Sequence, residues 1–136
     1  MNDKKFMLEA IREAEKAFKY DEVPVGAIIV KNNKIISRGY NRKEKDNVST
    51  RHAEIIAIEN ACKKLKSWRL DDCTLYTTLE PCSMCMGAIQ ESRMLRVVFG
   101  CPKNENYISG NKVLIDGFVE ENKCLELLKN FFENKR

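Results

Sequence analysis

The sequence predicts a layered α/β fold in which helices cover a central sheet. Segments with hydrophobic residues at helical spacing alternate along the chain with short runs of β-branched residues. Chains that alternate strands and helices build layered folds, because each helix buries its apolar face against the sheet. With 136 residues and neither internal repeats nor a Pro/Gly-rich linker, the chain is expected to form a single domain over residues 1–136.

The first forty residues predict a helix followed by a hairpin. From Asp3 to Tyr20, hydrophobic residues recur every three or four positions with charged residues between them, as in an amphipathic helix. The β-branched run Val23–Val30 and the run Lys34–Tyr40 lie on either side of an Asn-Asn pair. Two such runs around turn-forming residues predict a β-hairpin.

The middle of the chain predicts a loop, a helix, a strand and another helix. The polar stretch 41–50 is expected to be a loop, and His52–Leu65 a helix with Ser49 or Thr50 as a candidate cap. Cys73–Leu79 is typical of a strand. Pro81 then suits the start of a helix over the following SMCMGAIQES segment.

The remaining segments predict one more strand and a C-terminal helix. Arg96–Gly100 is a short apolar run typical of a strand. Residues 101–117 are less informative, with a polar loop before the apolar run 113–115. The final segment, 118–136, has the spacing of an amphipathic helix.

Composition limits the class of protein more than it identifies a partner. The chain carries 24 Lys and Arg against 20 Asp and Glu, and its formal charge of +4 is too small to identify a nucleic-acid partner. The charged N-terminus has no apolar run, so a cytoplasmic protein without membrane segments is expected. Six cysteines in a reducing compartment favour metal binding or redox chemistry over disulfides.

Two short motifs carry the chemistry. His52-Ala53-Glu54 contains the only histidine, and Pro81–Cys85 places two thiols three residues apart, on one side of the predicted helix. Zinc accepts imidazole and thiolate ligands, and catalytic zinc sites use three protein ligands and leave a fourth position for water. His52, Cys82 and Cys85 are therefore the predicted ligands of one zinc ion.

Each motif lies at the start of a predicted helix, so two helix N-termini are expected to converge on the metal. Their positive ends favour thiolate over thiol. Zinc lowers the pKa of its water toward about 7. Glu54, adjacent but not a ligand, is the predicted group that takes the water proton and passes it to the substrate.

With these motifs the sequence resembles the cytidine-deaminase-like zinc enzymes and, within them, the bacterial tRNA adenosine deaminases, whose signature is His-x-Glu followed by Pro-Cys-x-x-Cys. The similar segments extend over most of the chain: Glu22–Val30, Arg38–Arg42, Arg51–Ile58, Thr74–Ile89, Ser92–Gly100 and Leu127–Phe132. The resemblance implies a three-layer α/β/α fold with a mixed central sheet of about five strands. It also implies a homodimer that converts adenosine to inosine at the wobble position of a tRNA anticodon.

By the same resemblance, Asn41 would hydrogen-bond the target base, and the backbone N–H of Cys82 would contact the attacking oxygen. The pocket would be lined by Val25, Ala53, Leu79 and Glu80. Near the C-terminus, Phe131, Phe132, Lys135 and Arg136 are candidate contacts to the tRNA anticodon stem-loop, with at least one of the two phenylalanines expected to pack in the core.

Two other functions stay open at the level of the sequence. Residues 101–112 lack the Asp found in the corresponding Gly-rich loop of the tRNA enzymes, so a deaminase of a free nucleobase or nucleoside, such as guanine or cytosine, is an alternative. A non-catalytic, zinc-stabilised RNA-binding module is another, although a purely structural metal needs no adjacent Glu54. A structural zinc site would need a fourth ligand from Cys62, Cys73, Cys101 or Cys124, and a redox Cys-x-x-Cys would give no role to His52 and Glu54.

Overall fold

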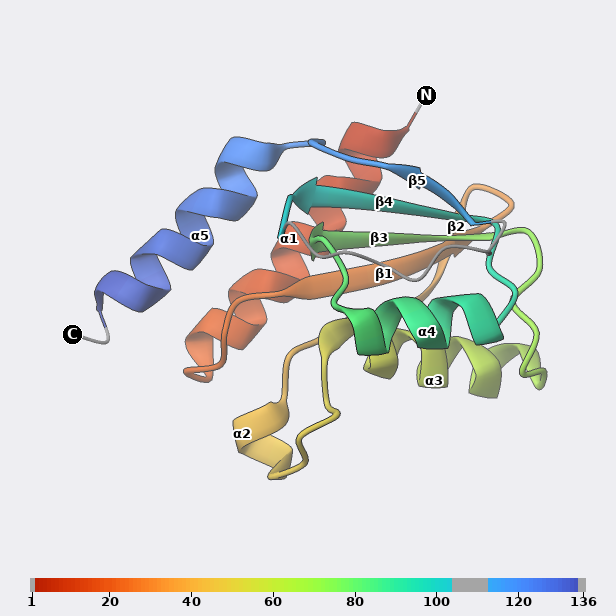
Figure 1. Cartoon of the computed structure of the whole chain (residues 1–136), viewed down its shortest axis with the longest axis horizontal. Coiled ribbons are helices and arrows are strands. Elements are labelled where there is room, and N and C mark those ends of the chain that lie inside the picture. The colour runs from red at the N-terminus through yellow and green to blue at the C-terminus, as the bar shows by residue number, and fades with distance from the viewer. Residues whose placement is uncertain (1, 104–112, 135–136) are drawn as a thin grey trace.

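A computed structural model describes residues 2–103 and 113–134 of the chain. Its helices and strands, shown in Figure 1, follow one another in this order: α1 (Asp3–Lys19), β1 (Gly26–Lys31), β2 (Lys34–Tyr40), α2 (Lys43–Asp46), α3 (Ala53–Leu65), β3 (Cys73–Leu79), α4 (Ser83–Glu91), β4 (Arg96–Cys101), β5 (Leu114–Asp116) and α5 (Glu121–Glu133). None of the helices within these described ranges combines the length and hydrophobicity needed to cross a bilayer.

The sheet is mixed and has five strands in the order β2-β1-β3-β4-β5. Strand β1 pairs antiparallel with both β2 and β3. Strands β3, β4 and β5 run parallel to one another, and the crossover between β3 and β4 contains helix α4. The predicted mixed sheet is confirmed.

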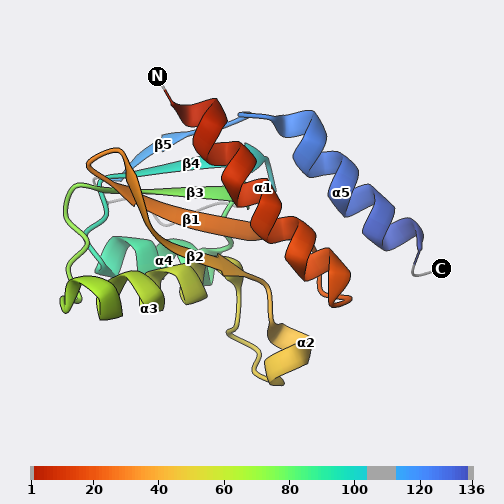
Figure 2. The same ribbon diagram turned by 180° about the vertical axis from the view of Figure 1, so that it is seen from behind.

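Helices cover both faces of this sheet, as Figures 1 and 2 show: α1 and α5 lie on one face, and α3 and α4 on the other. Side chains alternate between the two layers along each strand. In β1, Ala27 and Ile29 pack with the α3 and α4 layer, whereas Ile28 and Val30 pack with α1. The three-layer α/β/α architecture is therefore confirmed.

The predicted hairpin is present but its first strand is shorter. The two-residue turn is formed by Asn32 and Asn33, whose φ angles of 52° and 62° match the left-handed conformation that such turns require. Strand β1 begins at Gly26 rather than Val23, because Pro24 has no backbone N–H to donate to a neighbouring strand.

The polar stretch 41–50 contains the one-turn helix α2, where the residue pattern predicts only a loop. Glu22, only 2% exposed, holds this turn: its two carboxylate oxygens accept the backbone N–H groups of Glu44 at 3.1 Å and Lys45 at 2.6 Å. A buried carboxylate far away in sequence supplies the anchor, which local spacing does not reveal.

The predicted cap of α3 is wrong. The helix begins at Ala53 with His52 as its N-cap residue, not Ser49 or Thr50. The side chain of Asn41 accepts the Ala53 N–H at 2.8 Å, so a residue from the end of β2 satisfies one of the free donors at this helix end.

The boundaries of the last strand and the last helix differ from those predicted. Around the apolar run 113–115, Leu114–Asp116 forms the exposed edge strand β5. The last helix begins at Glu121 rather than at 118, because Phe118 and Glu120 adopt left-handed φ angles of 66° and 56°.

Gly39→Ala is expected to destabilise the protein by about 1–3 kcal/mol, the usual effect of overpacking a core. A Cβ at Gly39 would lie 2.5 Å from the Ala53 carbonyl oxygen and 2.8 Å from the Ala57 nitrogen, within the backbone of α3. The matched control is Gly87→Ala, where a Cβ would meet nothing within 4 Å. Urea unfolding of both variants tests this; equal loss of stability in both would contradict a close approach of α3 to β2.

Candidate metal and catalytic site

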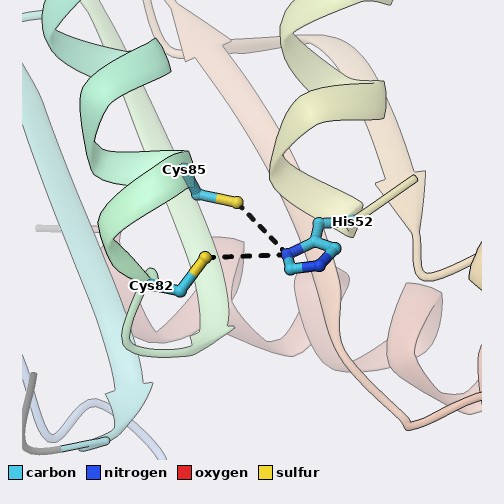
Figure 3. Close-up of side chains that lie close together, drawn as sticks. All are labelled: His52, Cys82 and Cys85. Atoms are coloured by element: carbon cyan, nitrogen blue, oxygen red, sulfur yellow. Dashed lines mark hydrogen bonds between the residues drawn. The ribbon is translucent and has the colours of Figure 1, made fainter. Parts of the chain in front are cut away.

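Three side chains that are distant in sequence meet between the starts of α3 and α4. The Nδ1 atom of His52 lies 3.5 Å from the Sγ of Cys85 and 3.7 Å from the Sγ of Cys82 (Figure 3). All three donor atoms lie within 4.8 Å of one another. The structure thus brings together the three side chains that the sequence singled out.

Helix geometry positions each donor. His52 and Cys82 are the N-cap residues of α3 and α4, both in extended backbone conformation, and Cys85 is in the first turn of α4. Two helix N-termini therefore point at the same site, as the sequence predicted, and their partial positive charge favours anionic thiolate ligands there.

The donor set fits zinc. In a tetrahedral site, a nitrogen at about 2.0 Å from zinc and a sulfur at about 2.3 Å are separated by about 3.5 Å, close to the spacing of these atoms. Burial lowers the pKa of His52, with smaller effects from the charges of Lys103 and Lys43, which favours the neutral imidazole that binds metals. Burial raises the pKa of Cys85, so that this thiol needs a cation beside it to ionise.

Within the described residues, no fourth cysteine closes this site. Over residues 2–103 and 113–134, the group of neighbouring metal-binding side chains consists of His52, Cys82 and Cys85 alone. Three of the other cysteines are buried and Cys62 is half-buried, elsewhere in the layers. Three protein ligands are the number found in catalytic zinc sites, which keep one position for water or substrate.

Glu54 lies in the first turn of α3 beside these donors and is only 4% exposed. Burial raises its pKa to about 7, against smaller lowering effects from a backbone hydrogen bond, from the Cys85 thiol and from the charge of Lys103. A carboxyl group with such a pKa can both take and return a proton near neutral pH.

These groups open into a cavity of about 900 Å³. Its walls include His52, Glu54 and Cys82 together with four residues that the resemblance placed around the substrate: Val25, Asn41, Leu79 and Glu80. Ala53 is fully buried and does not contribute to the wall. Its backbone N–H is instead occupied by the side chain of Asn41.

The hydrogen bond to Ala53 fixes the orientation of the Asn41 side chain. The carboxamide oxygen accepts the Ala53 N–H, which assigns the other end of the group as the NH2 donor. Asn41 can therefore offer hydrogen-bond donors to an acceptor on a substrate while its oxygen stabilises the start of α3.

The C-terminal aromatic residues also line this cavity. Phe131 is 8% exposed and packs edge-on against Phe18, whereas Phe132 is 53% exposed. One ring therefore packs in the core and the other is available at the surface. Lys135 and Arg136 lie outside the described residues.

Eight residues of the cavity wall were not foreseen from the sequence: Tyr20, Asp21, Glu22, Val23, Lys43, Glu44, Lys45 and Lys103. The loop lysines alternate with acidic residues, a pattern that favours a solvated loop. Lys103 lies in the segment that departs from the tRNA enzymes, and its backbone N–H donates to Glu80 at 2.8 Å. Sequence spacing gives no signal for Tyr20, Lys43 and Lys45, because Tyr20 ends α1 and the two lysines lie in α2.

Comparison with known proteins agrees with this geometry. Residues 1–101 match the family described as the cytidine and deoxycytidylate deaminase zinc-binding region. The tRNA-specific adenosine deaminase of Bacillus subtilis is 42% identical over 98% of this chain and 91% of its own length.

Two solved structures that resemble this one are named for two different deaminase activities. A tRNA:A34 deaminase that performs A-to-I editing at the wobble position superimposes with a TM-score of 0.86 and 35% identity, covering 91% of this chain and 99% of that one. The guanine deaminase of Bacillus subtilis has a TM-score of 0.71 and 41% identity over 75% of this chain and 66% of that one.

A chain with this donor triad, this buried glutamate and these relatives is a zinc-dependent hydrolytic deaminase, which excludes a purely structural RNA-binding module. It belongs to the cytidine and deoxycytidylate deaminase family, where it groups with the tRNA-specific adenosine deaminases.

Proposed function

We propose that this protein hydrolyses adenosine to inosine at the wobble position of a tRNA anticodon. The observation that carries the proposal is the buried carboxyl of Glu54 beside the donor triad of His52, Cys82 and Cys85, all at one cavity. The relatives that share most of the chain are named for deamination of tRNA adenosine, and they support the choice of substrate.

His52, Cys82 and Cys85 would hold the zinc ion. When bound, zinc supplies Lewis acidity that makes water nucleophilic near neutral pH. The two helix N-termini add positive potential at the same place, and the burial of Cys85 keeps solvent away from its side of the site.

Glu54 moves the protons of the reaction. Water adds its oxygen to C6 of adenine, Glu54 accepts a water proton and transfers it to the ring nitrogen next to C6, and the C6–N bond then breaks. Glu54 delivers the second proton to the leaving amino group, so one water is consumed and one ammonia released. The backbone N–H of Cys82, at the free end of α4, donates to the attacking oxygen.

The cavity walls hold the base in place for this chemistry. Asn41 donates from its carboxamide to an acceptor of the purine, and Val25 and Leu79 provide apolar surface for the ring. Glu80 is held in the wall because its carboxylate accepts a hydrogen bond from the Lys103 backbone.

The size of the cavity and the side chains around it favour RNA over a free base. A volume of about 900 Å³ lies near the upper end of the roughly 300–1,000 Å³ typical of ligand pockets, more than one nucleobase fills. Lys43, Lys45 and Lys103 lie in the cavity wall beside acidic residues, and each offers an ammonium group that can contact a phosphate. The exposed ring of Phe132 is suited to contact an unstacked base.

The proposal includes one domain over residues 1–136 that works in the cytoplasm as a homodimer. Exposed Leu95 and Leu114 give the chain apolar surface on which a second copy could pack. Sedimentation of the zinc-loaded protein measures this directly: a single monomeric species at micromolar concentration would contradict the dimer.

Guanine is the second candidate substrate. The similarity to a guanine deaminase and the replacement of the usual loop after Gly100 both favour testing it. Purified zinc-loaded protein is incubated in parallel with a tRNA anticodon stem-loop and with free guanine, cytosine and adenine. Inosine in the stem-loop supports the proposal, whereas ammonia from a free base with an unchanged stem-loop overturns it.

Asn41→Asp is expected to separate the two functions of this side chain. A carboxylate oxygen can still accept the Ala53 N–H, so stability should be maintained, but the NH2 donors for the base are lost. We expect deamination to fall by about 10- to 100-fold, equivalent to about 1–3 kcal/mol for an unpaired buried polar group. Asn41→Ala, which also removes the helix contact, should lose stability as well; thermal melting and inosine formation are the measurements.

A further inference from the structure

A tyrosine and a lysine form a defined pair at the mouth of the cavity. The Nζ atom of Lys45 lies 4.0 Å from the centroid of the Tyr20 ring, within the range of a cation–π interaction. Tyr20 is 53% exposed and stacks on Tyr40, with ring centroids 6.2 Å apart and planes 10° apart. Both members of the pair line the same cavity as Glu54.

The backbone below this lysine is fixed. The Lys45 N–H donates to the buried carboxylate of Glu22 at 2.6 Å, and the adjacent Glu44 N–H donates to the other carboxylate oxygen at 3.1 Å. Lys45 is thus restrained at both ends: its backbone by the hydrogen bond to Glu22, and its ammonium group by the contact with the Tyr20 ring. Such restraint lowers the entropy lost when a ligand binds.

The two nearby arginines differ from Lys45 in their pairing. Arg42 and Arg51 are both engaged by the carboxylate of Asp46. Among residues 2–103 and 113–134, the ion pairs of the structure include none with Lys45, whose contact is the neutral Tyr20 ring. The charge of Lys45 is therefore available to an incoming anion.

We propose that Lys45, whose ammonium group lies over the Tyr20 ring, binds a backbone phosphate of the RNA next to the target nucleotide. The inference rests on the proposed function, since only a substrate with flanking nucleotides brings a phosphate to the cavity mouth. An ammonium group is a compact point charge that suits phosphate oxygens. A ring already covered by Lys45 on one face and neighboured by Tyr40 serves to hold the cation rather than to stack a base.

The test measures RNA affinity separately from turnover. Zinc-loaded wild type, Lys45→Gln and the control Lys63→Gln, an exposed lysine in the last turn of α3, are titrated with a labelled anticodon stem-loop at several salt concentrations. Each contact to a single-stranded phosphate contributes roughly 0.7 to the slope of log K against log salt, so Lys45→Gln should bind about fivefold more weakly at about 0.1 M salt, with a slope lower by about 0.7. Lys63→Gln should match the wild type.

Variants of Tyr20 test whether its ring positions the ammonium group of Lys45. Tyr20→Phe keeps the ring face and is expected to bind RNA as the wild type does. Tyr20→Ala removes it and should weaken binding about two- to fivefold, but cause no further loss in combination with Lys45→Gln.

The outcomes distinguish this inference from the proposed function. Wild type that binds and deaminates the stem-loop, while Lys45→Gln equals Lys63→Gln in affinity and salt slope, overturns the phosphate site alone. Wild type that neither binds nor deaminates the stem-loop overturns the proposed function, and the phosphate site with it. A slope lowered only in Lys45→Gln supports the site.

Discussion

Glu54→Ala is expected to lower the rate of deamination by about 100- to 10,000-fold while the protein still binds zinc. General acid–base groups typically contribute this much to a rate. The metal should be retained because Glu54 is not part of the donor group of His52, Cys82 and Cys85. Inosine formation in the stem-loop and zinc content per chain, determined on the same preparation, measure both effects.

Glu54→Gln is the matched control, since it keeps the volume and hydrogen bonding of the buried side chain but accepts no proton. A loss as large as that of the alanine variant identifies proton transfer as the role of Glu54. Near-normal turnover in either variant would refute the mechanism, and loss of zinc in both would make Glu54 a ligand.

Cys82→Ser is expected to lose zinc and, with it, all measurable deamination. A serine hydroxyl is a poor replacement for a thiolate, which zinc binds strongly. Altering a group that only supports a ligand costs roughly 10- to 100-fold in metal affinity, so loss of a ligand should exceed this. The backbone N–H of residue 82 is unchanged, so the effect reports on the sulfur.

Cys62→Ser serves as its control, because Cys62 is also half-buried but lies outside the donor group. It should keep about one zinc per chain and normal activity. Because bound metal stabilises a folded protein, added zinc should raise the melting temperature of stripped wild type and Cys62→Ser but not that of Cys82→Ser. Equal zinc content in the two serine variants would exclude the proposed ligand set.

Most of the fold could be predicted from local patterns. Helix α1 and the hairpin follow from residue spacing alone, since an apolar stripe and an Asn-Asn turn each specify their own geometry. The start of β1 also has a local signal, since Pro24 cannot donate a backbone hydrogen bond to a neighbouring strand. The start of α3 could not be predicted, because Asn41, which follows β2, supplies the acceptor for the Ala53 N–H.

The candidate site, too, could be predicted only in part from the sequence. The ligands follow from motif chemistry, because His52 together with a Cys-x-x-Cys pair supplies the three donors of a catalytic zinc site, and Glu54 supplies the adjacent acid. The residues at the cavity mouth do not follow from the motifs. Tyr20 and Lys45 are brought together because the buried carboxylate of Glu22 anchors α2. No spacing rule connects these residues in the sequence.

The two faces of the sheet contribute different parts of the enzyme. The metal-binding helices α3 and α4 pack on one side, and α5, which brings Phe132 to the rim, packs on the other (Figure 2). Phe132 is therefore carried by a helix that provides none of the three metal-binding side chains. Placing the metal ligands and the exposed aromatic ring on separate elements allows the same catalytic centre to be combined with different substrate contacts.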